Sequence, residues 1–140
     1  SDVPLLSAVP DLNFGTLEIQ SSTATYGLYE DATLQVFDSS DVTSWKVTAA
    51  ATPFTQVGSQ GSKTLNPDAL GFIAEDGEFQ SLKIPVSIFE KSDVNNNFMY
   101  EKTWNAGDSK KGFVVKLNPL EGEAGVKYQS TITWSLIQGP

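Results

Sequence analysis

The chain has 140 residues, 39% of them hydrophobic, and a formal net charge of −8. This length fits one domain over residues 1–140, with residues 1–9 as a linker or leading arm. Cys, His and Arg do not occur, which excludes thiolate and imidazole metal ligands, Cys nucleophiles, Ser-His dyads and guanidinium forks for phosphate.

Charge and hydropathy also argue against two kinds of partner. Nucleic acid is not expected, because the net charge is negative and no basic cluster is longer than Lys110-Lys111. Membrane insertion is not expected, since no window holds the roughly 18 apolar residues that a spanning helix needs. The sequence opens without Met or a signal peptide and closes without an apolar tail, so we expect a mature fragment or an excised domain with no anchor of its own.

Most predicted elements are strands, because apolar and polar residues alternate with period two. In chain order the candidates are residues 12–19, 32–37, 43–50, 81–89, a stretch around 98–100, 112–117 and 128–137. Gly15 suggests a bulge or a close backbone approach in the first. Pro85 makes its strand an edge or a bulged one, because Pro cannot donate to a ladder. In that strand Ile84 should share a face with Leu82, Val86 and Ile88.

The segments between these strands are predicted turns and loops. Gly and Asn cluster at residues 56–62, 75–78, 93–97, 105–112 and 120–125. Residues 55–80 are the least regular and are expected as a long surface loop, with one short helical turn within residues 66–72. The spacing predicts an all-β, antiparallel β-sandwich of immunoglobulin-like type, with long loops and about seven to nine strands.

Two similar triplets stand far apart in the chain: Trp45-Lys46-Val47 and Trp134-Ser135-Leu136. In a strand, residues i and i+2 point to the same side, so each triplet sets an indole beside an aliphatic side chain while its middle residue points away. We predict that folding brings the two triplets together, with both indole rings turned toward the same side.

Three stretches carry a family resemblance: VPDLNFGTLEI, LQVFDSSDVTSWKVTAAATPF and GVKYQSTITWSLIQGP. Over roughly residues 10–140 the chain resembles the WxL domain of cell-surface proteins in low-GC Gram-positive bacteria. Trp134-Ser135-Leu136 fits the motif as written, whereas the first triplet has Val47 where Leu is usual. That exchange keeps an apolar group on the same face.

The resemblance implies a secreted protein held non-covalently on the cell wall, at the cell surface. It implies peptidoglycan or another wall polymer as the target, companion surface proteins as partners, and adhesion to host extracellular matrix as a further role. The resemblance makes Trp45, Val47, Trp134 and Leu136 the first candidates for binding residues.

The burial of these Trp residues is left open between two interpretations. Each Trp offers about 150–250 Å² for burial, which favours the core, but a half-buried ring could still leave one edge for a partner. Trp104 is a candidate exposed aromatic that could stack on a sugar. The alternative for Trp104 is a ring folded over the end of the core.

Neither a metal site nor an active site emerges. Asp93, Asn95 and Asn97 have the spacing of a calcium loop, but Phe98 stands where Gly is needed and Trp104 where Glu is needed, so a turn is predicted instead. Acidic loops at residues 38–41 and 75–78 could bind a hard cation loosely. The carboxylates are scattered as on a solvated surface, and no pair marks a glycosidase cleft. We therefore expect no catalysis, no cofactor and no defined metal.

The sequence thus predicts a non-catalytic module for wall attachment or for association with companion surface proteins, with contacts from Trp45, Val47, Trp134, Leu136 and Trp104. A carbohydrate-binding module is one alternative, and it would show an exposed, coplanar row of aromatic rings. An assembly or adhesion domain that pairs with a protein through an edge strand is the other.

Overall fold

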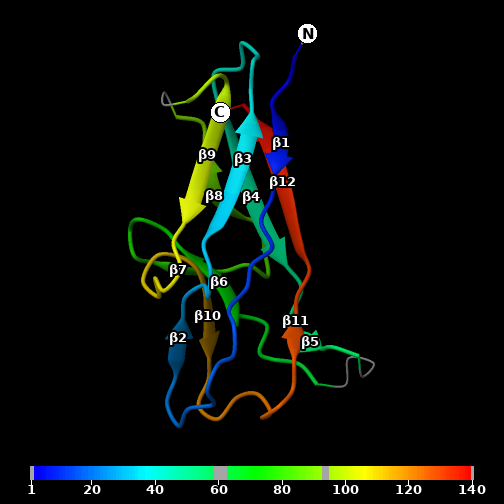
Figure 1. The fold of residues 1–140 in the computed structure, drawn as a ribbon, viewed down its shortest axis with the longest axis vertical. Helices are drawn as coiled ribbons and strands as arrows, with labels where there is room; N and C mark the ends of the chain where they lie inside the picture. The colour runs from blue at the N-terminus through cyan, green and yellow to red at the C-terminus, as the bar shows by residue number, and fades with distance from the viewer. Residues whose placement is uncertain (1, 59–62, 93–94, 140) are drawn as a thin grey trace.

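The computed structural model describes residues 2–58, 63–92 and 95–139, and within them every regular element is a β-strand. The strands, labelled in Figure 1, are β1 (Leu5–Ala8), β2 (Ala24–Tyr26), β3 (Ala32–Phe37), β4 (Trp45–Ala51), β5 (Thr55–Gln56), β6 (Leu70–Ile73), β7 (Phe79–Ser81), β8 (Val86–Glu90), β9 (Met99–Trp104), β10 (Gly112–Leu117), β11 (Tyr128–Gln129) and β12 (Ile132–Gln138). Every strand pair is antiparallel, so the predicted all-β antiparallel class is confirmed. None of these residues belongs to a helix long and apolar enough to span a membrane.

Within the described residues the strands form four small sheets, with the orders β1-β3-β9, β2-β10-β6-β7, β11-β5 and β12-β4-β8. Figure 1 shows the two three-stranded sheets in the upper half and the other two in the lower half. Trp45 on β4 meets Tyr100 on β9 with ring centroids 5.4 Å apart, so the two upper sheets pack against each other. Leu82 ties the halves together, because its N–H donates to Leu70 O and its C=O accepts from Ala51 N–H.

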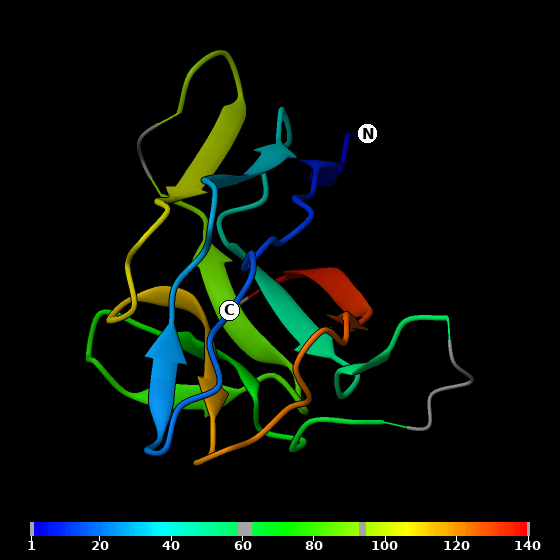
Figure 2. The same cartoon turned by 60° about the horizontal axis from the view of Figure 1, so that its bottom comes forward.

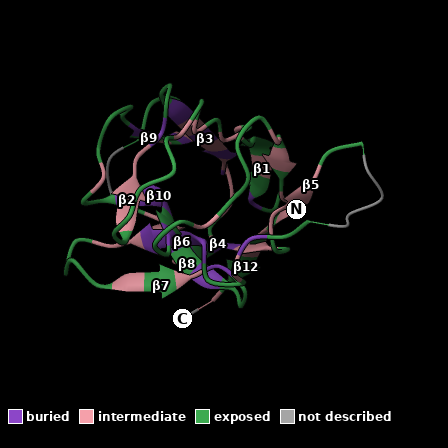
Figure 3. Cartoon of the chain, turned by 90° about the horizontal axis from the view of Figure 1, so that it is seen from below, coloured by how far each residue is buried: buried purple, intermediate pink, exposed green. Residues whose placement is uncertain are grey.

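Alternation of side chains decides what enters the core. In β3, the apolar residues Ala32, Leu34 and Val36 are buried, while the residues between them are half-buried. β10 lies between β2 and β6, and Phe113, Val114 and Val115 are all buried, so this strand is covered on both faces and does not show the alternating burial that a period of two predicts. Figure 3 shows buried positions on β3 as well as on β4, β6 and β10, with β7 less buried at the margin.

Residues 12–19 form no strand, contrary to the prediction. The Gly15 N–H donates to the Asn13 side chain at 2.8 Å, and Gly15 has φ of +73°, which turns the chain out of an extended path. A Cβ at Gly15 would lie 2.9 Å from Cδ1 of Tyr29, so the predicted close backbone approach is confirmed. Figure 2 shows this blue segment running from β1 to β2 without a strand, and its apolar side chains Leu12 and Leu17 rest on the core.

The predicted strand over residues 81–89 begins only at Val86. The Lys83 N–H donates to the Ser81 hydroxyl at 3.2 Å, which makes a turn. Ile84 is therefore 62% exposed instead of lying with Leu82 in the core. β8 is an edge strand of its sheet, so the predicted edge position is confirmed. Its register against β4 shifts between Val47 and Thr48, inside β8 and not at Pro85, where a bulge was the alternative.

Residues 55–80 are not one long surface loop, because they contain β5, β6 and β7. At the position of the predicted helical turn the chain forms a single turn directly before β6, in which the Ala69 N–H donates to Asn66 O at 3.1 Å. Turns or bends occur as expected within residues 75–78, 105–112 and 120–125. Residues 59–62 and 93–94, and with them the Asp93 of the rejected calcium pattern, lie outside the described residues. Of residues 1–9, expected as a linker or arm, Leu5–Ala8 form β1 against β3.

Candidate functional site

The two Trp triplets lie side by side on adjacent strands. β12 pairs with β4 so that Leu136 stands opposite Val47 and Trp134 opposite Ala49. Directly opposed residues on antiparallel strands point to the same face of a sheet. The predicted shared neighbourhood, and the shared side of the two indoles, are therefore confirmed by the register.

The two indoles nevertheless enter different parts of the core. Trp45 lies opposite Gln138, four residues along β4 from the partner of Trp134, which is a separation of about 13 Å in an extended strand. Trp45 packs edge-on against Phe89 at 5.5 Å, whereas Trp134 packs on Phe113 at 5.8 Å. The triplets therefore do not form one continuous aromatic patch.

Trp45 is anchored by a buried carboxylate. Its indole Nε1–H donates to Oδ2 of Asp38 at 3.0 Å, and Lys91 Nζ donates to the same oxygen at 2.8 Å. Ser40 donates its backbone N–H and its hydroxyl to the other oxygen. Burial would raise the pKa of Asp38, but the hydrogen bonds from Lys91, Ser40 and Trp45 outweigh it and lower that pKa to about 2. Asp38 is therefore an ionised structural group, with its oxygens occupied by protein donors.

Burial decides which predicted contact residues are accessible. Trp45 is 2% exposed and Val47 is 0% exposed. The prediction that these two residues contact a partner at the surface is therefore wrong, and the core interpretation holds for them. Trp134 and Leu136 are half-buried and pack on the core from the edge of the sheet. The expectation of an exposed Trp104 is also wrong, because it is 7% exposed.

Trp104 is buried because it ends β9 on the inward-facing side of that strand, four residues after the buried Tyr100. Its ring lies edge-on to Phe113 at 4.8 Å and to Phe72 at 6.1 Å. The ring folds over the end of the core, as the alternative interpretation had it.

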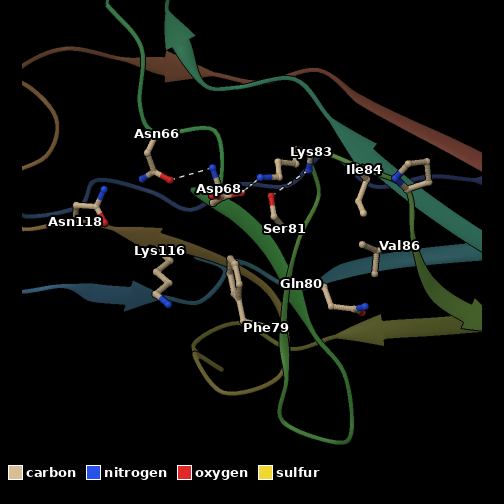
Figure 4. A pocket seen from close by; sticks show the side chains of 11 residues that line it. Asn66, Asp68, Phe79, Gln80, Ser81, Lys83, Ile84, Val86, Lys116 and Asn118 are labelled. Carbon is tan, nitrogen blue, oxygen red and sulfur yellow. Dashed lines mark hydrogen bonds and ion pairs between the residues drawn. The ribbon is translucent and has the colours of Figure 1, made fainter.

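Sequence reasoning missed a groove of about 710 Å³ at the edge formed by β7 and the start of β8. Figure 4 shows its lining, which consists of Asn66, Asp68, Phe79, Gln80, Ser81, Lys83, Ile84, Pro85, Val86, Lys116 and Asn118. These residues come from three separate parts of the chain, so no local motif could have revealed the groove. Ile84 alternates with Leu82 and Val86 like a core residue, so nothing in the sequence indicated that it would line an exposed groove.

Phe79 forms the aromatic floor of this groove. Its ring lies over the backbone of Gly71 on β6, where a Cβ would be 2.2 Å from Cε2 of Phe79. Gly at position 71 is therefore what lets the ring settle on the sheet. Lys116 Nζ lies 5.2 Å from the centroid of the same ring, and Figure 4 shows the two side chains beside each other.

The groove is close to neutral in an acidic protein. Lys83, Lys116 and Asp68 line it, and the Glu121 carboxylate lies beside it on Asn66 and Asn118, whereas the whole chain carries −8. Lys83 Nζ contacts Asp68 at 3.0 Å, and this hydrogen bond lowers the pKa of the Asp68 carboxyl. The Asn66 amide is held in place, since it donates to Glu121 at 2.7 Å and accepts from the Asp68 N–H at 2.9 Å. The groove thus offers an ammonium group, amides and an apolar ring together.

A second hollow, of about 580 Å³, lies between the 12–19 segment and residues 121–132. It is lined by partly buried apolar side chains such as Phe14, Leu17 and Phe54, which belong to the seam between this segment and the core. Its polar lining includes Glu18, Glu121 and Glu123, so the hollow is acidic and does not suit the carboxylates of an anionic wall polymer.

The described residues contain no group of three or more acidic side chains placed to hold a metal ion. Of the two acidic loops, Asp38 is engaged by Lys91, and Glu75 pairs with Lys111 at 2.8 Å. Neither a family model, nor a curated protein, nor a solved structure matches this chain.

Proposed function

We propose that this chain is a non-catalytic cell-surface module that attaches non-covalently to the Gram-positive cell wall. The resemblance of its two Trp triplets and their flanks to the WxL domain supports the assignment. We further propose that its paired sheets belong to an immunoglobulin-like sandwich and that the protein works after secretion. In this proposal the triplets build the fold, and the wall contact lies elsewhere.

The groove around Phe79 is the observation that carries the proposal. Peptidoglycan presents the apolar faces of its sugars, N-acetyl amides, and carboxylates on its peptide stems. An aromatic ring, the amides of Asn66 and Asn118, and the ammonium of Lys116 are complementary to these groups. The chain and the anionic wall repel each other, but salt screens this repulsion beyond about 8 Å, so short-range contacts of this kind must provide retention.

Co-sedimentation with purified peptidoglycan tests the proposal. We expect Lys116→Gln and Phe79→Ala each to weaken binding by about tenfold, the equivalent of one charged or stacking contact. Lys110→Gln is the matched control, because Lys110 lies in the 105–112 turn and does not line the groove. Wild-type affinity in both groove variants would reject this site.

The structure speaks against a carbohydrate-binding module built on a row of exposed Trp. Trp45, Trp104 and Trp134 all pack against the core cluster, and these are the three Trp of the chain. Association with companion surface proteins or host matrix stays a second proposal, and the uncharged edge strand β12 favours it.

A further inference from the structure

The outer edge of β12 is the best-formed unpaired surface among the described residues. β12 ends the sheet order β12-β4-β8 and pairs with β4 alone. Figure 1 shows it in red along one side of the molecule. Its register against β4 runs without a shift from Ile132 to Gln138. The outer side of a regular strand presents a row of backbone N–H and C=O groups that can pair with another strand.

Hydrogen bonds at the two ends of β12 show which residues face outward. Thr131 O accepts from Thr52 N–H, and Gly139 N–H donates to Ser44 O, so these odd-numbered residues bond toward β4. Ladder bonds alternate along an antiparallel strand. The even-numbered residues of β12, which include Trp134 and Leu136, therefore direct their backbone N–H and C=O to the outer edge.

This edge lacks the protection that the other edges have. Residues 128–139 contain no charged side chain and no Pro. By contrast, β1 has a register shift, β8 has a register shift and follows Pro85, and β9 carries Glu101 and Lys102. β2 and β7 are three residues long, whereas β12 has seven. Bulges, charges, Pro and short length are the usual means of preventing edge pairing, so β12 is the edge open to a partner.

The pattern of β12 is complementary to itself. In an antiparallel pair of two β12 strands centred on Ser135, Trp134 stands opposite Leu136 of the partner subunit, and all seven residues overlap. The same register pairs even with even residues, so every outward N–H and C=O finds a partner. Aromatic–aliphatic and Thr–Ile cross-strand pairs of this kind stabilise sheets.

We propose that two copies of this chain associate through β12 into one continuous six-stranded sheet. The self-complementary register selects a second copy, and no charged side chain of β12 enters the interface, so the repulsion between two chains of −8 acts only at a distance, where salt screens it. One strand pair of seven residues is a small contact, so we expect a weak, concentration-dependent dimer. The β7–β8 groove lies at the opposite edge of the sheet, so a dimer leaves it open and presents two wall contacts. The dimer does not depend on the proposed groove function.

Sedimentation velocity over rising protein concentration tests the dimer. Ser135→Lys places two ammonium groups opposite each other at the centre of the dimer contact. The monomer tolerates this substitution because the Ser135 side chain is exposed. We expect it to be monomeric and folded by circular dichroism. Ser87→Lys is the matched control, because Ser87 lies in the same cross-strand row, beside Thr48, on the far edge strand β8. This control keeps the wild-type association.

Mixing Ser135→Lys with Ser135→Glu should restore dimers through opposite charges at the centre. Amide exchange gives a second readout, in which Trp134 and Leu136 N–H groups slow as wild-type concentration rises and do not slow in Ser135→Lys. A wild-type monomer at about millimolar concentration, an equally dimeric Ser135→Lys, or open-ended aggregation would each overturn the proposal.

Discussion

Replacing Asp38 with Asn keeps the shape of a buried side chain but removes the charge that holds Lys91 and the Trp45 indole. The pKa of Asp38 falls from 3.8 to about 2 on folding. One pKa unit corresponds to about 1.4 kcal/mol, so ionised Asp38 contributes about 2 kcal/mol to the free energy of unfolding. The variant also leaves the largely buried Lys91 without its counter-charge, so we expect Asp38→Asn to cost about 2–4 kcal/mol in total.

The pH dependence of this loss has a definite sign. Because the folded pKa of Asp38 lies below the unfolded one, its contribution is complete above about pH 4 and disappears as the pH falls through about 2. The stability difference between wild type and Asp38→Asn should therefore be constant from about pH 5 to pH 8 and shrink below about pH 4. Urea denaturation followed by Trp fluorescence at each pH measures it.

Asp41→Asn is the control for this experiment, since Asp41 is an exposed carboxylate of the same acidic loop. It should change stability by less than about 0.5 kcal/mol. If Asp38→Asn behaved like this control, or if its cost did not vary with pH, the reasoning about the buried network would be refuted.

Further substitutions test the packing and the wall contact. Gly15→Ala should lower stability by about 1–2 kcal/mol in urea denaturation, because it places a Cβ at positive φ against Tyr29. Trp104→Ala should lower it by about 3–5 kcal/mol, because it empties the space beside Phe113. Removing Trp134 should abolish most acrylamide-quenchable emission, since the other two indoles are buried; unchanged quenching would contradict its half-exposed position. Binding to purified walls should strengthen from pH 7 to pH 4.5, as carboxylates approach their pKa range of about 4 and repulsion falls; constant or weaker co-sedimentation would contradict this.

Strict alternation predicted the strands that are buried on one face. The predicted 32–37 range coincides with β3, because its inward residues Leu34 and Val36 meet the core while Thr33 on the other face is only half-buried. The two-residue spacing predicted that each triplet has its Trp and its aliphatic side chain on one face, and the further prediction that the two triplets lie together is confirmed on β4 and β12. Periodicity works here because each strand has one face against the core.

Alternation failed where tertiary contacts decide the structure. Residues 12–19 alternate like a strand, yet the turn at Asn13 and Gly15 makes them a loop that lies on the core. β6 was expected in a loop because Leu70 to Ile73 do not alternate, and they are buried because β6 lies between β10 and β7. Burial of the indoles could not be read from spacing, because Asp38 and Lys91 approach Trp45 only in the folded chain.

The candidate site was out of reach for the same reason. Phe79 and Lys116 are far apart in sequence, and neither belongs to a recognisable motif. Their proximity depends on β7 and β10 lying on either side of β6, and on Gly71 admitting the Phe79 ring. Only the assembled sheet places a ring, an ammonium group and amides in one groove.

An NMR titration of the folded chain with soluble peptidoglycan fragments measures the wall contact most directly. We predict saturable shifts of the backbone amides of Phe79, Gln80 and Lys116, with little change at Trp45. Shifts confined to the Trp triplets, or no shifts at all, would contradict the assignment of the wall contact to the groove.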